Sequence, residues 1–185
     1  MRTIELLGCD EQAVRASMRV VARISPSDLA LATPCAEWDL GALLAHMTVQ
    51  HRGFAAAAAG RGGDPEVWRA GTPSVDAYLR SADEVIAAFA AHDNDFLLPE
   101  ITARPVPRRM AIGFHLVDYV VHGWDVATAL GLGYDLPTEV LAAALPIAEA
   151  VPEGSTAFAA PLPDPGGSTF DRILTRLGRS VGPRG

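Results

Sequence analysis

Cysteine is scarce in this sequence, whose 185 residues include only Cys9 and Cys35. Two cysteines are too few for the disulfide framework of a small secreted domain, so we expect a reduced, cytoplasmic protein. Aromatic residues are also rare, at 6% of the chain, although hydrophobic residues reach 49% and include many alanines. Small side chains let helices approach one another closely, so this composition favours packed helices over a β-sandwich.

Basic residues are outnumbered, with 15 lysines and arginines against 22 aspartates and glutamates and a formal net charge of −7. Contacts to phosphate groups need a basic face, so we expect neither nucleic acid nor an anionic membrane as a partner. No apolar run reaches the ~18 residues of a membrane span, and the first residues lack the apolar core of a signal peptide. We expect a single domain over residues 1–185 that takes a small-molecule substrate. The oligomeric state stays open, with a homodimer among the options.

Apolar residues recur at helical spacing in six segments, and turn-forming residues separate these segments. The expected helices cover residues 4–24, 40–59, 74–91, 108–130, 138–151 and 168–178. Asp39 and Ser74 can cap the second and third of them. A tail rich in proline and glycine, residues 153–168, has room for a short strand. The pattern predicts an all-α fold, an up-and-down four-helix bundle with short extra C-terminal elements.

The segment FHLVDYVVHGWD, residues 114–125, carries two of the five histidines and two aspartates in an apolar helix. Asp118 and His122 lie one helical turn apart on one face, and His115 and Asp125 fall within about 60° of that face. Ionisable side chains in an apolar environment are costly unless they are paired, hydrogen-bonded or bound to a metal. This helix therefore needs a polar partner from elsewhere in the chain.

His46, in the segment LLAHMTVQH of the second expected helix, is the obvious partner. Metal sites in bundles are built from side chains on facing helices. Asp118 and His122 are separated by about 6 Å of helical rise and can reach one ion, whereas His115 lies about 10.5 Å from His122 along the axis. The spacing therefore predicts His46, Asp118 and His122 as ligands of a divalent metal, with a fourth position open as in catalytic zinc sites. Nickel, iron or manganese would also accept these ligands.

Other residues near these ligands receive supporting roles. We expect His115 to face the open position or the substrate and to transfer protons, since its unperturbed pKa lies near neutrality. Asp125 is expected to orient a ligating histidine or to join the helix to a loop. His51 lies about 140° around its helix from His46 and is expected to be peripheral. Cys35 has the chemistry of a nucleophile, but no base adjoins it in the sequence.

Three other interpretations stay open at this stage. Asp118 and His122 are also compatible with a buried polar pair that binds no metal, because an Asp/His pair four residues apart is a weak signal. A metal at these residues could activate water for hydrolysis instead of activating a thiol. The bundle could also be a non-catalytic module that binds a metal or another ligand.

Two motifs resemble a known group of proteins. TPCAEWDLGALLAHM resembles the T-P-C-x-x-W-x-x-x-x-L-x-x-H entry of the DinB/YfiT-like metal-binding superfamily. HGWDVATALG resembles a segment, H-x-W-D-L-A-x-A-x-G, of short, uncharacterised members of the mycothiol-dependent maleylpyruvate isomerase N-terminal family. The resemblance covers roughly residues 5–180. It implies a four-helix bundle with a divalent metal, usually zinc, on a histidine of the second helix and a later carboxylate-x-x-x-His pair. These roles fall on His46, Asp118 and His122.

The resemblance also implies a reaction, in which a metal activates a low-molecular-weight thiol, mycothiol, for attack on a small electrophile. Such a protein would be a thiol-dependent S-transferase or isomerase. Two departures concern the named isomerase. It is similar in having a carboxylate at the position of Asp118, but that carboxylate is a glutamate. It also carries a second, C-terminal domain with an essential arginine, for which we find no counterpart, so we expect the isomerisation itself not to transfer.

Overall fold

The computed structural model describes residues 2–35, 38–155, 157–164 and 166–181, and over these residues the protein is all-helical. Its α-helices are α1 (Thr3–Val21), α2 (Leu40–Ala58), α3 (Val75–Ala91), α4 (Arg108–Ala129), α5 (Thr138–Glu149) and α6 (Thr169–Arg176). Two short 3-10 helices are η1 (Pro26–Asp28) and η2 (Pro65–Trp68). The predicted bounds differ by at most three residues, so the all-α fold is confirmed. Residues 36 and 37 of the TPCAEWD motif lie outside the described residues.

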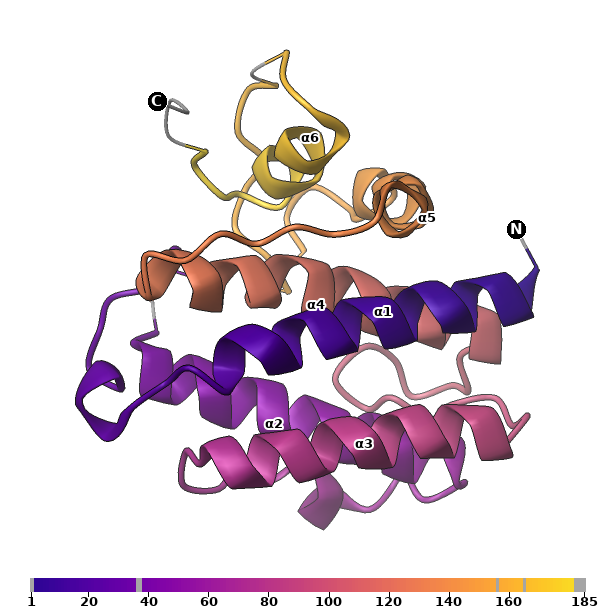
Figure 1. The fold of residues 1–185 in the computed structure, drawn as a ribbon. Helices are drawn as coiled ribbons and strands as arrows, with labels where there is room; N and C mark the ends of the chain where they lie inside the picture. The colour runs from indigo at the N-terminus through magenta and orange to yellow at the C-terminus, as the bar shows by residue number, and fades with distance from the viewer. Residues whose placement is uncertain (1, 36–37, 156, 165, 182–185) are drawn as a thin grey trace.

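The first four α-helices form a bundle in which α1 lies beside α4 and α2 beside α3 (Figure 1). The α2 and α3 helices run in the same direction. Asn94, just after α3, donates a hydrogen bond to the carbonyl of Ala58 at the end of α2 (2.9 Å). At the other end, Ala45 of α2 and Pro73, just before α3, line one shallow hollow. The helical bundle is therefore confirmed, but its chain directions do not alternate between α2 and α3 as expected.

The connection 59–74 makes this parallel arrangement feasible. A helix of the length of α2 is about 28 Å long, and ~16 residues of extended chain can span nearly twice that distance. Trp68 of η2 fastens the connection, because its Nε1 donates to the carbonyl of Gly62 (2.8 Å). The Trp68 ring lies so close to Gly53 of α2 that any Cβ there would collide with it. The glycine-rich segment is thus a crossover along α2 and not a tight turn.

The core lies between α1, α2, α3 and α4, and its largest side chains include two buried tyrosines. Buried phenol groups need hydrogen-bond partners. Tyr119 of α4 donates to the carbonyl of Met47 in α2, and Tyr78 of α3 is bonded to the Ser17 hydroxyl of α1 (2.6 Å). These bonds link α4 to α2 and α3 to α1 across the core. Among the described residues, no helix is both long and apolar enough to cross a membrane.

The C-terminal elements cover one side of the bundle. The α5 helix packs against α1 and α4, and α6 packs against α5 (Figure 1). Leu162 donates its backbone N–H to the carbonyl of Thr175 (2.8 Å), which ties the tail to α6. The described part of residues 153–168 contains no strand, which corrects the short strand expected there. The segment after α6 then returns toward α4, where it meets the candidate site.

The contact between Gly53 and Trp68 predicts opposite effects for two glycine substitutions in helices. Alanine has a higher helix propensity than glycine by about 1 kcal/mol. Gly8→Ala in α1 adds a methyl group in open space and should raise the free energy of unfolding by up to that amount. Gly53→Ala should instead lower it by about 1–3 kcal/mol, because overpacking against Trp68 outweighs the propensity gain. Urea denaturation of both variants measures the difference, and a stabilised Gly53→Ala would contradict the packing.

Candidate metal centre

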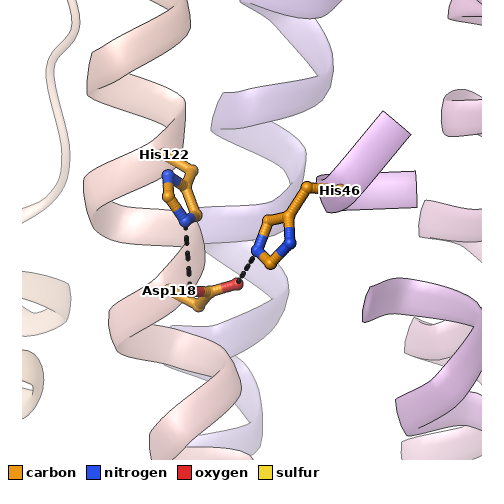
Figure 2. Close-up of side chains that lie close together, drawn as sticks. All are labelled: His46, Asp118 and His122. Atoms are coloured by element: carbon orange, nitrogen blue, oxygen red, sulfur yellow. Dashed lines mark ion pairs between the residues drawn. The ribbon is translucent and has the colours of Figure 1, made fainter. Parts of the chain in front are cut away.

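Three predicted site residues meet between α2 and α4 (Figure 2). His46 comes from α2, and its Nε2 lies 4.0 Å from Oδ2 of Asp118 on α4. His122, one turn further along α4, has its Nε2 3.4 Å from the other carboxylate oxygen, Oδ1. One candidate ligand atom from each residue lies within 4.8 Å of the other two. The structure thus brings together the three side chains predicted as ligands.

The donor set fits a divalent ion. Two imidazoles and one carboxylate are the protein ligands of many catalytic zinc centres. The His46 and Asp118 side chains are 25% and 22% exposed, whereas His122 is 3% exposed, so solvent reaches the cluster through His46 and Asp118. Metal binding at these residues stays a prediction, now with a geometry that supports it.

Aromatic rings border the cluster. The Trp38 ring lies 4.4 Å from the His46 ring and 6.0 Å from the His122 ring, centroid to centroid. Phe158, from the tail before α6, lies 6.5 Å from the His122 ring. Apolar walls displace water, and electrostatic interactions between the enclosed charges become stronger as the local dielectric falls. Neither aromatic residue was singled out as a site residue from the sequence.

The His122 ring is hydrogen-bonded to the buried carboxylate of Asp125 on the side away from Asp118. Its Nδ1 donates to Oδ2 of Asp125 (3.0 Å), and this bond leaves Nε2 directed at Asp118. Asp125 also accepts two hydrogen bonds from the Arg179 guanidinium, at 3.2 Å and 2.8 Å. Such a carboxylate behind a ligating histidine fixes the ring orientation and raises the basicity of the ligand. Asp125 therefore makes both contacts expected of it, to a candidate ligand and to a residue outside its helix, while its role in orienting a bound ligand stays a prediction.

Burial and neighbouring charges shift the pKa values of the three candidate ligands. Burial alone would raise the pKa of Asp118, but the attraction of His122 and His46 is larger and lowers it to about 2. Burial opposes the protonation of His122, yet Asp118 and Asp125 together raise its pKa to about 9. Burial lowers the pKa of His46 to about 4 despite the opposing attraction of Asp118. Near neutral pH, the His46 ring is therefore neutral, whereas His122 holds a proton that an incoming ion would have to displace.

His115 lies behind the cluster and not at its open side. Its ring is fully buried, its Nδ1 donates to Oδ1 of Asp10 in α1 (2.7 Å), and its Nε2 is hydrogen-bonded to Nδ1 of His51 (3.1 Å). His51 is itself fully buried and stacks on Tyr119 with ring centroids 3.9 Å apart. The structure thus separates His115 from the three candidate ligands, and the expected position facing the substrate is not observed. Proton transfer by His115 stays a prediction.

The buried position of His51 corrects the expectation that it is peripheral. A helical wheel assigns one inward face, but α2 is buried on most of its circumference because α3, α4 and η2 all contact it. Burial and the nearby His115 keep the pKa of His51 well below its ordinary value, so its ring is neutral. Asp10 and Arg179 were also missed. The buried charges of α4 were the only signal that such partners must exist.

Comparisons with known proteins agree with these features. A model of the mycothiol maleylpyruvate isomerase N-terminal domain matches residues 11–127. The chain belongs to this family. The matched region contains His46, Asp118 and His122 but ends before Arg179. The resemblance inferred from the two motifs is therefore confirmed.

Relatives of the chain add little on activity. Two uncharacterized proteins of Mycobacterium tuberculosis, from strain CDC 1551 / Oshkosh and strain H37Rv, are each 28% identical to it over 154 residues. Each alignment covers 76% of this chain and 76% of the relative. No solved structure matches the chain. The function is therefore inferred mainly from the geometry of the site.

The convergence of the three side chains predicts how substitutions change metal binding. His46→Ala and His122→Ala should each lose the bound ion, because removal of a ligand costs more than the 10–100-fold in affinity that is typical of loss of a ligand's supporting hydrogen bond. Asp118→Ala should weaken binding, whereas Asp118→Glu should retain it, since a carboxylate remains. Elemental analysis and competition with a chromophoric chelator measure these effects. His92→Ala, at the end of α3, serves as a control, and full metal content in either histidine variant would exclude the assignment.

The raised pKa of His122 predicts that metal affinity depends on pH. Since the ion competes with one proton on His122, apparent affinity should rise about tenfold per pH unit from pH 6 to 8 and level off near pH 9. Below about pH 4 the dependence should steepen, because His46 then binds a proton as well. Calorimetry in buffers of different ionisation enthalpy should detect release of about one proton at pH 7. An affinity that is constant between pH 6 and 8 would contradict the charge state.

Proposed function

We propose that the protein is a metal-dependent enzyme of thiol chemistry, an S-transferase or isomerase that joins a low-molecular-weight thiol such as mycothiol to a small electrophile. One observation carries the proposal, the convergence of His46, Asp118 and His122 around a point with access to solvent. Membership of the mycothiol maleylpyruvate isomerase N-terminal family supports the choice of a thiol as cosubstrate. The ion would be zinc in the first instance, and the cytoplasm would keep the thiol reduced.

A divalent ion at these residues would supply Lewis acidity, lowering the pKa of a coordinating thiol so that the thiolate is available at neutral pH. The protonation states of the surrounding side chains suit the binding of this ion. His46 presents an unprotonated ring nitrogen, and Asp118 stays ionised at neutral pH. Asp125 holds a proton at Nδ1 of His122 and so keeps Nε2 for the ion. Each ligand therefore has the protonation state that binding requires once the second proton of His122 has left.

The rings beside the cluster would shape the substrate site. Trp38 and Phe158 both lie against His122 and come from segments that precede α2 and α6. Such walls favour a small substrate with an apolar body and exclude water from the nucleophile. The same centre could activate water in place of a thiol, which would make the protein a hydrolase. Dependence of turnover on thiol distinguishes the two chemistries.

A cobalt-substituted protein tests the proposal directly. Added low-molecular-weight thiol should produce strong sulfur-to-cobalt charge-transfer bands, and the bands should disappear in His46→Ala. His115→Ala should keep the bands, because His115 is not a ligand, but should slow thiol addition by about 10²-fold if it transfers a proton. Turnover of an ester or amide without thiol, with no change in the spectrum, would support hydrolysis. A spectrum that responds to no ligand would leave a non-catalytic binding module as the function.

A further inference from the structure

Arg179 is a buried cation in the segment that follows α6. The residue is 2% exposed, and its guanidinium faces Asp125, which is fully buried. Nε donates to Oδ1 of Asp125 (3.2 Å) and Nη2 donates to Oδ2 (2.8 Å), while Nη1 donates to the carbonyl of Leu177 (2.8 Å). A planar guanidinium that meets both oxygens of one carboxylate fixes the plane of that carboxylate. Arg179 therefore determines how Asp125 is oriented.

Asp125 passes this constraint to the candidate metal ligands. Its Oδ2 accepts from Arg179 and also from Nδ1 of His122 (3.0 Å), whose Nε2 faces Asp118 (3.4 Å). Loss of Arg179 would leave the carboxylate buried without its cation, which is strongly unfavourable. Asp125 would then move or bind a proton, and the His122 ring would lose its fixed orientation. The guanidinium thus acts on the site through two intervening side chains.

The other arginines of this region make different contacts. Arg172 in α6 pairs with Glu149 at the surface (2.8 Å), with both side chains about half exposed.

Phe158 adds a second link between the tail and the site, because it lies 6.5 Å from the His122 ring and 5.8 Å from the Arg179 guanidinium. The segment around α6 therefore contacts the site from two points, although it lies outside residues 11–127, which the family model covers.

We propose that Arg179 is a positioning residue for the metal centre and that Phe158 and Arg179, which bracket α6, make the C-terminal segment part of that centre. The proposal rests on the proposed metal-binding function. It means that the three ligands alone do not give full metal affinity, which also requires the docked C-terminal segment. By thermodynamic linkage, an ion that binds more tightly to the docked form also stabilises docking. Metal binding should then reduce the local opening of α6, far from the ligands in sequence.

Zinc affinity of the full chain tests the proposal. Arg179→Met should bind zinc about 10–100-fold more weakly than the wild type, the usual effect of losing a partner behind a ligand. Arg179→Lys keeps the positive charge but not the planar group that bonds both carboxylate oxygens, so it should lose less zinc affinity. Arg15→Met, which removes a half-exposed ion pair with Glu11 within α1, is the control and should bind zinc as the wild type does. Circular dichroism and thermal melting of the metal-free variants establish that each is folded. If Arg179→Met does not fold, Arg179→Lys carries the comparison.

A double-mutant cycle separates positioning from general stabilisation. Since Arg179 acts through Asp125, Arg179→Met should cost little further affinity in an Asp125→Asn background. Hydrogen exchange of residues 169–176 should slow when zinc is added to the wild type, but not in Arg179→Met. Zinc binding that is equal in wild type and Arg179→Met, or fully additive losses, would overturn the inference alone. A wild type that binds no zinc would overturn the proposed function together with it.

Discussion

The ionisable side chains of α4 cannot be buried without partners, and the rest of the structure supplies those partners. Burial of an unpaired charge costs more free energy than the net stability of a typical domain. Each such group therefore needs a hydrogen-bonded or oppositely charged partner from another element. Three such pairs are present. Asp118 is paired with His46 from α2, Asp125 with Arg179 from the C-terminal segment, and His115 with Asp10 from α1. One polar row on one helix therefore fixes how α1, α2 and the tail are placed around it.

These partners form two clusters with different access to water. The outer cluster, with His46 and Asp118, is about a quarter exposed and can exchange protons and ligands with solvent. The inner cluster, with His115 and His51, is fully buried among aromatic rings. A sealed and hydrogen-bonded network of this kind can specify a single packing arrangement, whereas an open one can bind and react. The two neighbouring groups of histidines on and beside α4 therefore differ in their access to solvent.

The sequence predicted what depends on local spacing and missed what depends on distant partners. Helix bounds follow from periodicity and from caps such as Asp39, whose side chain does accept from the Ala42 N–H. Asp118 and His122 could be paired because four residues make one turn. A helical wheel could not predict the burial of His51, because that burial depends on α3, α4 and η2 packing against several sides of α2. Nor does anything local mark Arg179, which reaches Asp125 across 54 residues.

The charge count of the outer cluster indicates what kind of ligand suits it. At neutral pH the anionic members are balanced by two cations, because the pKa values of Asp118 and Asp125 are lowered while those of His122 and Arg179 are raised. A divalent ion that replaces the His122 proton leaves the cluster with one positive charge in excess. Displacement of that proton from a pKa near 9 costs about 3 kcal/mol at pH 7. A ligand with a single negative charge restores neutrality and helps to offset this cost, since charge balance matters most where little water can screen it. A thiolate would meet that requirement, and so would the hydroxide of the hydrolytic alternative.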